Sequence, residues 1–267
     1  MKKHLLSLIA LSIFFLSCSE NKEEKNEKSD NSDTQEVAND TQEAGDIIEK
    51  IDAYVTSEDS KLETYGQMNS LPFANLADKL EFQSFFLYDE AGKLKAIEYY
   101  SNTDKSQDVS RFYYDNDALV YASEAHSDYD NDENFIEKKY YFNEGNVIKV
   151  VETKGFSDVK VAELPLDGQN ISNQTALDLM EFKGDFEISF AGFIEQPGGV
   201  FLIVNAKKPG FNSALVVDEK GADEFMKDLY DNQKKYMGKK MIVKWEAVVN
   251  PSNGMRQNAY RGGEWVE

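Results

Sequence analysis

Phe85–Leu94 (FFLYDEAGKL), Arg111–Val120 (RFYYDNDALV) and Lys139–Ile148 (KYYFNEGNVI) share one pattern, which decides the fold of the chain. Each segment begins with aromatic residues, passes through a turn rich in Asp, Asn or Gly, and returns to apolar residues. Aromatic and β-branched residues favour strands, while Asp, Asn and Gly tolerate the positive backbone angles of tight hairpin turns. The pattern therefore predicts three consecutive β-hairpins, which together form a six-stranded antiparallel meander.

A short helix is expected just before the meander. Five apolar residues recur at helical spacing after Asp46, which can cap the start of the helix: Ile47, Ile48, Ile51, Tyr54 and Val55. An amphipathic helix of this kind is stable when its apolar face covers another element. We therefore assign residues 46–154 to one domain, in which the helix packs on the meander.

The last part of the chain, 183–267, predicts three strands, a helix over 221–236 and two more strands. This order is that of an OB-type barrel. Residues 237–245 (MGKKMIVKW) also resemble the entry to the fourth strand of OB-like domains in lipoproteins. Residues 155–182 are expected to connect the two domains. The expected fold class is thus mostly β (α+β): an antiparallel hairpin meander with a packed N-terminal helix, followed by a small OB-like β-barrel with one helix.

The chain is strongly acidic, with 29 Lys+Arg against 49 Asp+Glu among its 267 residues. The excess lies before residue 183, because 183–267 holds 12 basic and 12 acidic residues. This charge argues against nucleic acid or an anionic lipid headgroup as the main partner. One cysteine excludes disulfides within the chain, and two histidines argue against a His-based zinc site.

The N-terminus has the pattern of an export signal. Lys2 and Lys3 precede an apolar run, Leu5–Leu16, which is shorter than the roughly 20 residues that cross a bilayer. A small residue, Ser17, then precedes Cys18. This arrangement resembles the signal peptides of bacterial lipoproteins.

The resemblance implies that residues 1–17 are removed and that the Cys18 thiol receives a diacylglycerol. It also implies acylation, for example by palmitate, of the new amino group. Two or more acyl chains hold a protein firmly on a membrane. Phe15 departs from the family pattern, in which Leu is most common at that position.

Residues 18–45 are expected to form a lipidated, acidic, disordered tether, because they hold too few apolar residues to build a core. Within them, Lys22, Glu23 and Glu24 resemble the surface-export signal of Bacteroidetes lipoproteins. The resemblance implies an outer-membrane, lipid-anchored protein displayed on the cell surface. The periplasmic side of the same membrane is the alternative.

The loop Asp128–Asn134 is the sharpest local signal for a metal. Asp128, Asp130 and Asp132 alternate, and hard cations such as Ca²⁺ take oxygen ligands. The EF-hand pattern nevertheless requires Gly where Glu133 stands and Glu where Lys139 stands. These residues are therefore only weak Ca²⁺ candidates, and no cofactor is expected.

Four residues of the last two strands are candidates for a ligand-binding face: Trp245, Tyr260, Trp265 and Arg256. No nucleophile elbow, P-loop or dinucleotide-binding motif is present in the sequence. We therefore expect a non-enzymatic binding or assembly role at the cell envelope, with an envelope protein or a glycan as partner. A carboxylate-dependent envelope hydrolase, with or without Ca²⁺, and an inhibitor or immunity-type lipoprotein are the alternatives.

Lipidation of Cys18 is directly testable. Cys18→Ala should move the protein from the membrane fraction to the soluble fraction, because no acyl chain can then be attached. Cell fractionation with immunoblotting measures this, and Ser19→Ala is the matched control that should stay with membranes. Membrane retention of the Cys18→Ala protein would contradict the assignment.

Overall fold

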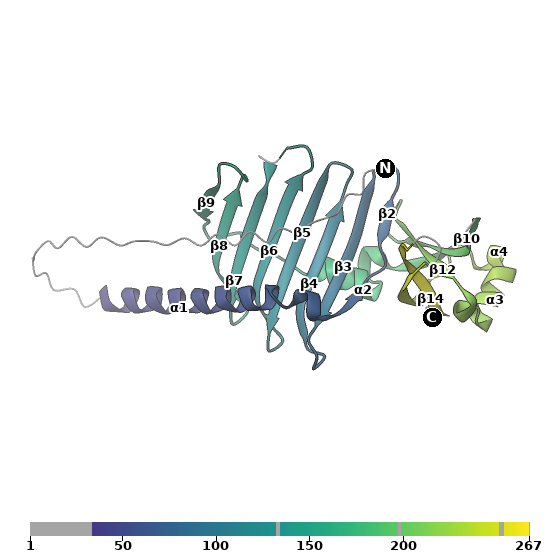
Figure 1. Ribbon diagram of the computed structural model, residues 1–267, viewed down its shortest axis with the longest axis horizontal. Helices are drawn as coiled ribbons and strands as arrows, with labels where there is room; N and C mark the ends of the chain where they lie inside the picture. The colour runs from purple at the N-terminus through teal and green to yellow at the C-terminus, as the bar shows by residue number, and fades with distance from the viewer. Residues whose placement is uncertain (1–33, 132–133, 197–198, 251–253, 267) are drawn as a thin grey trace, which may run out of the picture. The chain divides into compact units, whose positions relative to one another are not determined.

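The computed structural model describes residues 34–131, 134–196, 199–250 and 254–266 (Figure 1). The chain divides into two compact units, Met1–Thr41 and Gln42–Glu267, and the second holds all the strands. The described part is mostly β, as the sequence predicts. None of its helices has the length and apolar character needed to cross a membrane.

The six-stranded meander is confirmed. Its strands pair antiparallel in sequence order: β3 (Leu80–Tyr88), β4 (Leu94–Asn102), β5 (Ser106–Asp115), β6 (Ala118–Asp128), β7 (Ile136–Asn143) and β8 (Asn146–Lys154). Two short strands, β1 (Gly66–Asn69) and β2 (Phe73–Asn75), pair with the free edge of β3. At the other edge, β9 (Lys160–Glu163) pairs with β8.

The three hairpins repeat in detail. Two of the turns are built on residues of positive φ, Asn116 with Asp117 and Glu144 with Gly145, as a two-residue hairpin turn requires. Just before each turn the register shifts at the same position of the repeat: Leu87/Tyr88, Tyr113/Tyr114 and Tyr141/Phe142. Such bulges increase the local twist of the strand.

Side chains alternate between the two faces of the meander, so consecutive residues of the repeat point in opposite directions. One face carries Phe86, Phe112 and Tyr140, and we name it the α2 face. The opposite face carries Leu87, Tyr113 and Tyr141, and we name it the α1 face. Because both faces are apolar near the turns, both need a cover.

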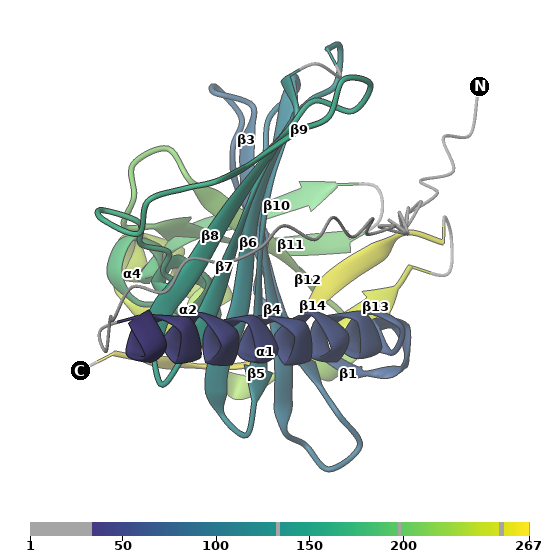
Figure 2. The same ribbon diagram turned by 90° about the vertical axis from the view of Figure 1, so that its left-hand side faces the viewer.

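The long helix is α1 (Thr34–Asp59), and its part from residue 47 onward covers the α1 face and lies across the strands (Figure 2). Ile51 is buried at this contact. Hydrogen bonds add to the packing, because the Tyr141 hydroxyl donates to Asp52 at 2.9 Å and the Tyr113 hydroxyl donates to Asp59. The helix predicted after Asp46 is therefore present and packed on the meander.

The helix begins earlier than expected. Residues 34–45 are helical, so the prediction of a disordered tether is wrong for these residues. They contain no Pro, and Gly45 is their only Gly. Adding a turn to an existing helix is far less costly than nucleating one, so a polar segment without Pro can extend the helix outward.

The α2 face is covered by the segment that follows the meander. Ala176 and Leu179 of α2 (Gln174–Glu181) are buried, and Ile171 packs in the same cluster as Tyr140. The segment 155–182, expected to connect two domains, thus adds an exposed edge strand, β9, to the sheet and a helix to the core.

The C-terminal part contains β10 (Ile188–Gln196), β11 (Gly199–Ala206), β12 (Asn212–Val217), α3 (Glu224–Asp231), α4 (Gln233–Tyr236), β13 (Met241–Val249) and β14 (Arg256–Trp265). Single 3₁₀ turns are η1 (Leu62–Thr64), η3 (Gly184–Phe186) and η4 (Glu219–Gly221). The strand order is β10-β11-β12-β14-β13, with β12 and β14 parallel.

The expected barrel does not close. A single bridge, Ser189 with Lys240, joins β10 to the residue before β13. The sheet instead continues into the meander through β2, where Asn212 pairs with Ala74. The helix expected over 221–236 is also divided, because the Asn232 side chain bonds back to the Asp228 carbonyl and ends α3.

The centre of the meander should be the most sensitive part of the fold. Ile97 is 0% exposed and packs between the neighbouring Phe86 and Phe112. Ile97→Ala should lower the free energy of unfolding by about 2–5 kcal/mol. Ile194→Ala, on a strand residue that is 49% exposed, should cost less than about 0.5 kcal/mol. Urea denaturation measures both, and similar losses would contradict this location of the core.

Candidate functional site

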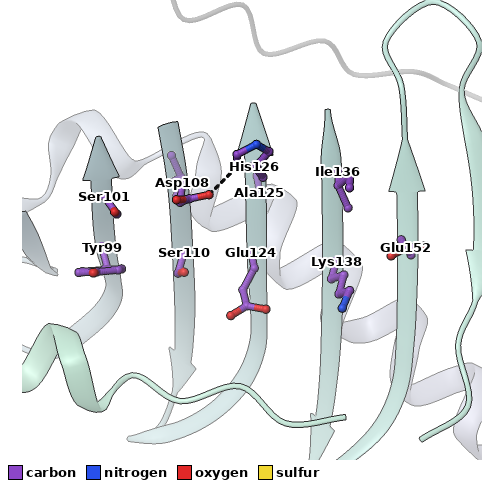
Figure 3. A pocket seen from close by; sticks show the side chains of 11 residues that line it. Tyr99, Ser101, Asp108, Ser110, Glu124, Ala125, His126, Ile136, Lys138 and Glu152 are labelled. Carbon is purple, nitrogen blue, oxygen red and sulfur yellow. Dashed lines mark hydrogen bonds and ion pairs between the residues drawn. The ribbon is translucent and has the colours of Figure 1, made fainter. Parts of the chain in front are cut away.

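The helices α1 and α2 pack on the meander near its hairpin turns. Both helices pack beside the repeat residues that precede the three hairpin turns. Toward the opposite ends of strands β4–β8, no helix among the described residues lies over the α2 face (Figure 1). A groove of about 560 Å³ lies on this open surface, which we name the sheet groove (Figure 3).

The sheet groove is lined from five neighbouring strands. Its lining residues are Tyr99, Ser101, Asp108, Val109, Ser110, Glu124, Ala125, His126, Ile136, Lys138 and Glu152. The strand register explains why polar residues gather here. Ser110 pairs with Tyr99 and Glu124, and Lys138 pairs with Glu124 and Glu152, so these five side chains share one row across the sheet.

This row lies two residues along each strand from the buried aromatic row. Ser110 is two residues before Phe112, and Lys138 is two residues before Tyr140, so both point to the α2 face. The groove floor is therefore a continuation of the core surface. A rigid, hydrogen-bonded ladder holds its side chains at fixed spacing.

His126 lies at one side of the groove between two carboxylates. Its Nδ1 is 2.7 Å from Oδ1 of Asp108, and its Nε2 is 3.3 Å from Oδ1 of Asp128. The hydrogen bond with Asp108 raises the pKa of His126 above its usual value, and the nearby charge of Asp128 adds to this effect. Asn134 fixes the other oxygen of Asp128 at 2.6 Å.

The charged groups of the floor are only partly paired with other described residues. Within the part of the chain that the structure describes, the Lys138 ammonium forms no ion pair, although acidic residues flank it on both neighbouring strands. Glu124 accepts a hydrogen bond from Tyr140 at 3.0 Å, and Glu152 pairs with Lys154 at 2.7 Å. These groups retain free hydrogen-bonding capacity toward the groove.

Hydroxyl groups extend the same floor. Those of Tyr99, Ser101 and Ser110 make no hydrogen bond with any other described residue. Burial raises the pKa of Tyr99 to about 12, so its phenol stays protonated at neutral pH and can donate. The groove thus offers donors and acceptors side by side.

The surroundings of His126 do not suit the activation of a serine nucleophile. A serine nucleophile needs a histidine with a free ring nitrogen as its base. Both ring nitrogens of His126 already face carboxylates, which favours the protonated imidazolium. His126 is therefore poorly suited to activating Ser101 or Ser110.

Some residues expected to be functional lie outside the described ranges: Cys18, Lys22, Glu23, Glu24 and Asp132. Asp128 contacts His126 but does not itself line the sheet groove, and Asp130 is exposed in the loop that follows. Among the residues with described side chains, no group of three or more His, Cys, Asp and Glu is arranged to hold a metal ion.

The candidate ligand face of the last two strands is not assembled as expected. Tyr260 is 0% exposed, so its proposed role in stacking on a ligand is wrong. Trp245 pairs with it across the strands, packs on Phe182 and donates its indole N–H to the Asn69 carbonyl at 3.2 Å. Core packing thus takes up these aromatic rings.

The other two candidates lie apart from each other. The Trp265 ring packs on Tyr236, with 4.7 Å between ring centroids, and Lys239 lies 4.4 Å from the Trp265 ring centre. Arg256 is exposed at the start of β14, the opposite end of the strand.

Comparisons with protein families, with curated proteins and with solved structures find no match to this chain. Evidence for the function of the sheet groove therefore comes from its geometry and its lining residues.

The pairing of His126 with Asp108 can be measured by titration. Because the pKa of His126 is raised in the folded state, its stabilising effect is complete below the unfolded pKa and is lost as pH rises through the folded pKa. NMR titration should give a pKa above 6.5. Asp108→Asn should lower this pKa more than Asp128→Asn does, because the Asp108 contact is the shorter. An unchanged pKa in the Asp108→Asn protein would contradict the pairing.

Proposed function

We propose that this chain is a lipid-anchored protein of the bacterial outer membrane that binds a glycan in the sheet groove without converting it. The observation that carries the proposal is the groove floor, where hydroxyl, ammonium and carboxylate groups lie side by side on a rigid sheet. Several of them, including Lys138 and the hydroxyls of Ser101 and Ser110, have no partner among the described residues, so they are available to a ligand.

Sugar hydroxyls both donate and accept hydrogen bonds, and the groove can satisfy both roles. Lys138 and Tyr99 can donate, while the Glu124 carboxylate has lone pairs left beyond its bond from Tyr140. Hydrogen bonds with ionised groups are stronger than those between neutral groups. The floor spans five strands, or roughly 20 Å at the usual strand spacing, which suits an oligosaccharide.

Anchoring by Cys18 would hold the groove at the envelope, where glycans are abundant. The net charge of −20 also disfavours binding to anionic membrane lipids and nucleic acid. These features support the envelope location, and an envelope protein as partner is the alternative outcome of the test below.

Substitutions in the row of the groove should weaken glycan binding. Glu124→Gln and Lys138→Met should each reduce the affinity about tenfold or more, because a hydrogen bond to a charged group contributes about 1.5–3 kcal/mol. Glu137→Gln, on the opposite face of the same sheet, is the matched control and should bind as well as the native chain. Calorimetry with glycans released from the envelope of the producing bacterium measures the affinities.

Two results would contradict the proposal. One is the absence of binding to any envelope glycan. The other is an equal loss of affinity in the Glu137→Gln control, which would place the ligand away from the groove. Recovery of a stoichiometric protein instead of a glycan would favour the assembly role.

A further inference from the structure

A second cavity, of about 400 Å³, lies in the C-terminal part between α3 and the strands β10–β12. Its size falls in the range of small-molecule sites, which are concave and mostly apolar with a few polar groups. The apolar walls are Phe193, Val200, Val217 and Met226. The cavity belongs to a different part of the sheet from the groove, and none of its lining residues is shared with it.

One wall of this cavity is formed by two aromatic rings that contact each other. The ring of Tyr230 meets that of Phe193 edge to face, with 5.1 Å between ring centroids. The Tyr230 hydroxyl donates to the Glu195 carboxylate, which holds the ring in place. Tyr230 is nevertheless 40% exposed, so part of it remains available to a ligand.

The rim of the cavity carries an excess of negative charge. Asp218 is neutralised by Arg261, whose two terminal nitrogens lie 2.8 and 2.9 Å from its oxygens. The side chains of Glu219 and Asp231 have no such partner among the described residues. Lys227 is the one basic residue in the lining, so the carboxylates outnumber it.

We propose that this cavity binds an organic cation with a flat apolar body, such as an aromatic amine. The apolar body would be removed from water against Phe193 and Val217, which is the main favourable contribution. The cationic group would lie near Asp231 and Glu219 and beside the exposed part of the Tyr230 ring, where cation–π attraction adds to the charge interaction. A neutral ligand of the same shape gains only the first of these contributions.

Three probes of one shape separate these contributions: 2-naphthylmethylamine, 2-naphthylmethanol and 2-naphthoate. Methyl NMR of the Cys18→Ala full-length chain, with labelled Val and Met, reports binding at the cavity. The amine should bind at least fivefold tighter than the alcohol, and 2-naphthoate should bind weaker still. Shifts should centre on the methyl groups of Val200, Val217 and Met226.

Variants then test the location and the charge. Glu219→Gln combined with Asp231→Asn should bring the affinity for the amine closer to that for the alcohol, leaving the cation–π contribution of Tyr230 as the difference. Val217→Trp should fill the cavity and abolish binding of all three probes, and Tyr230→Ala provides a second test should Val217→Trp disturb the fold. Tyr129→Ala, at a tyrosine that is 54% exposed in another loop, is the control and should change nothing.

Equal affinity for the three probes would overturn the proposal, because it would indicate a generic apolar void. Absence of binding, or shifts centred outside the cavity, would overturn it as well. None of these outcomes bears on the glycan groove, whose lining residues are all different.

Discussion

Aromatic packing on both faces of one sheet is the constraint on which the rest of this structure depends. Each repeat places large side chains at two consecutive strand positions, such as Phe112 and Tyr113, and a strand turns such neighbours to opposite faces. Neither face can then be left to solvent near the turns. In this structure α1 covers one face, and α2 with the segment before it covers the other.

The same constraint explains where the sheet groove lies. The aromatic positions of the repeat precede the hairpin turns, so the covers gather at that end of the strands. Two residues farther along, the α2 face changes from Phe112 and Tyr140 to Ser110 and Lys138. Polar side chains there need no cover. The ladder that is fixed by the core extends into the open part, and it holds the groove residues in register.

Much of the fold could be predicted from local patterns in the sequence. The hairpins were predictable because each turn holds residues that tolerate positive φ, such as Asn116 and Asp117. The succession of three strands, a helical segment and two strands in the C-terminal part also followed from the sequence. The lack of closure did not follow, because it depends on how far β10 pairs with the distant residues before β13, and this pairing is limited to the bridge of Ser189 with Lys240. The early start of α1 at Thr34 was missed because a polar helix end carries no apolar period.

The candidate site was harder to predict. Tyr99, Glu124 and Lys138 come from three strands, and only the register brings them into one row. No spacing in the sequence marks that row, although its offset of two from the aromatic positions is a usable signal once the hairpins are aligned. Tyr260 was wrongly predicted to bind a ligand. Its aromatic ring and the basic residues near it in sequence suggested an exposed stacking surface, but the residue is buried in the core.

The most direct test of the groove as the ligand site is photo-crosslinking in intact cells. A diazirine amino acid would replace Ser110 on the groove floor, or Thr153 on the opposite face as control. Glycan binding in the groove predicts a carbohydrate adduct from position 110 and none from position 153. Adducts of equal yield from both positions, or from 153 alone, would contradict it.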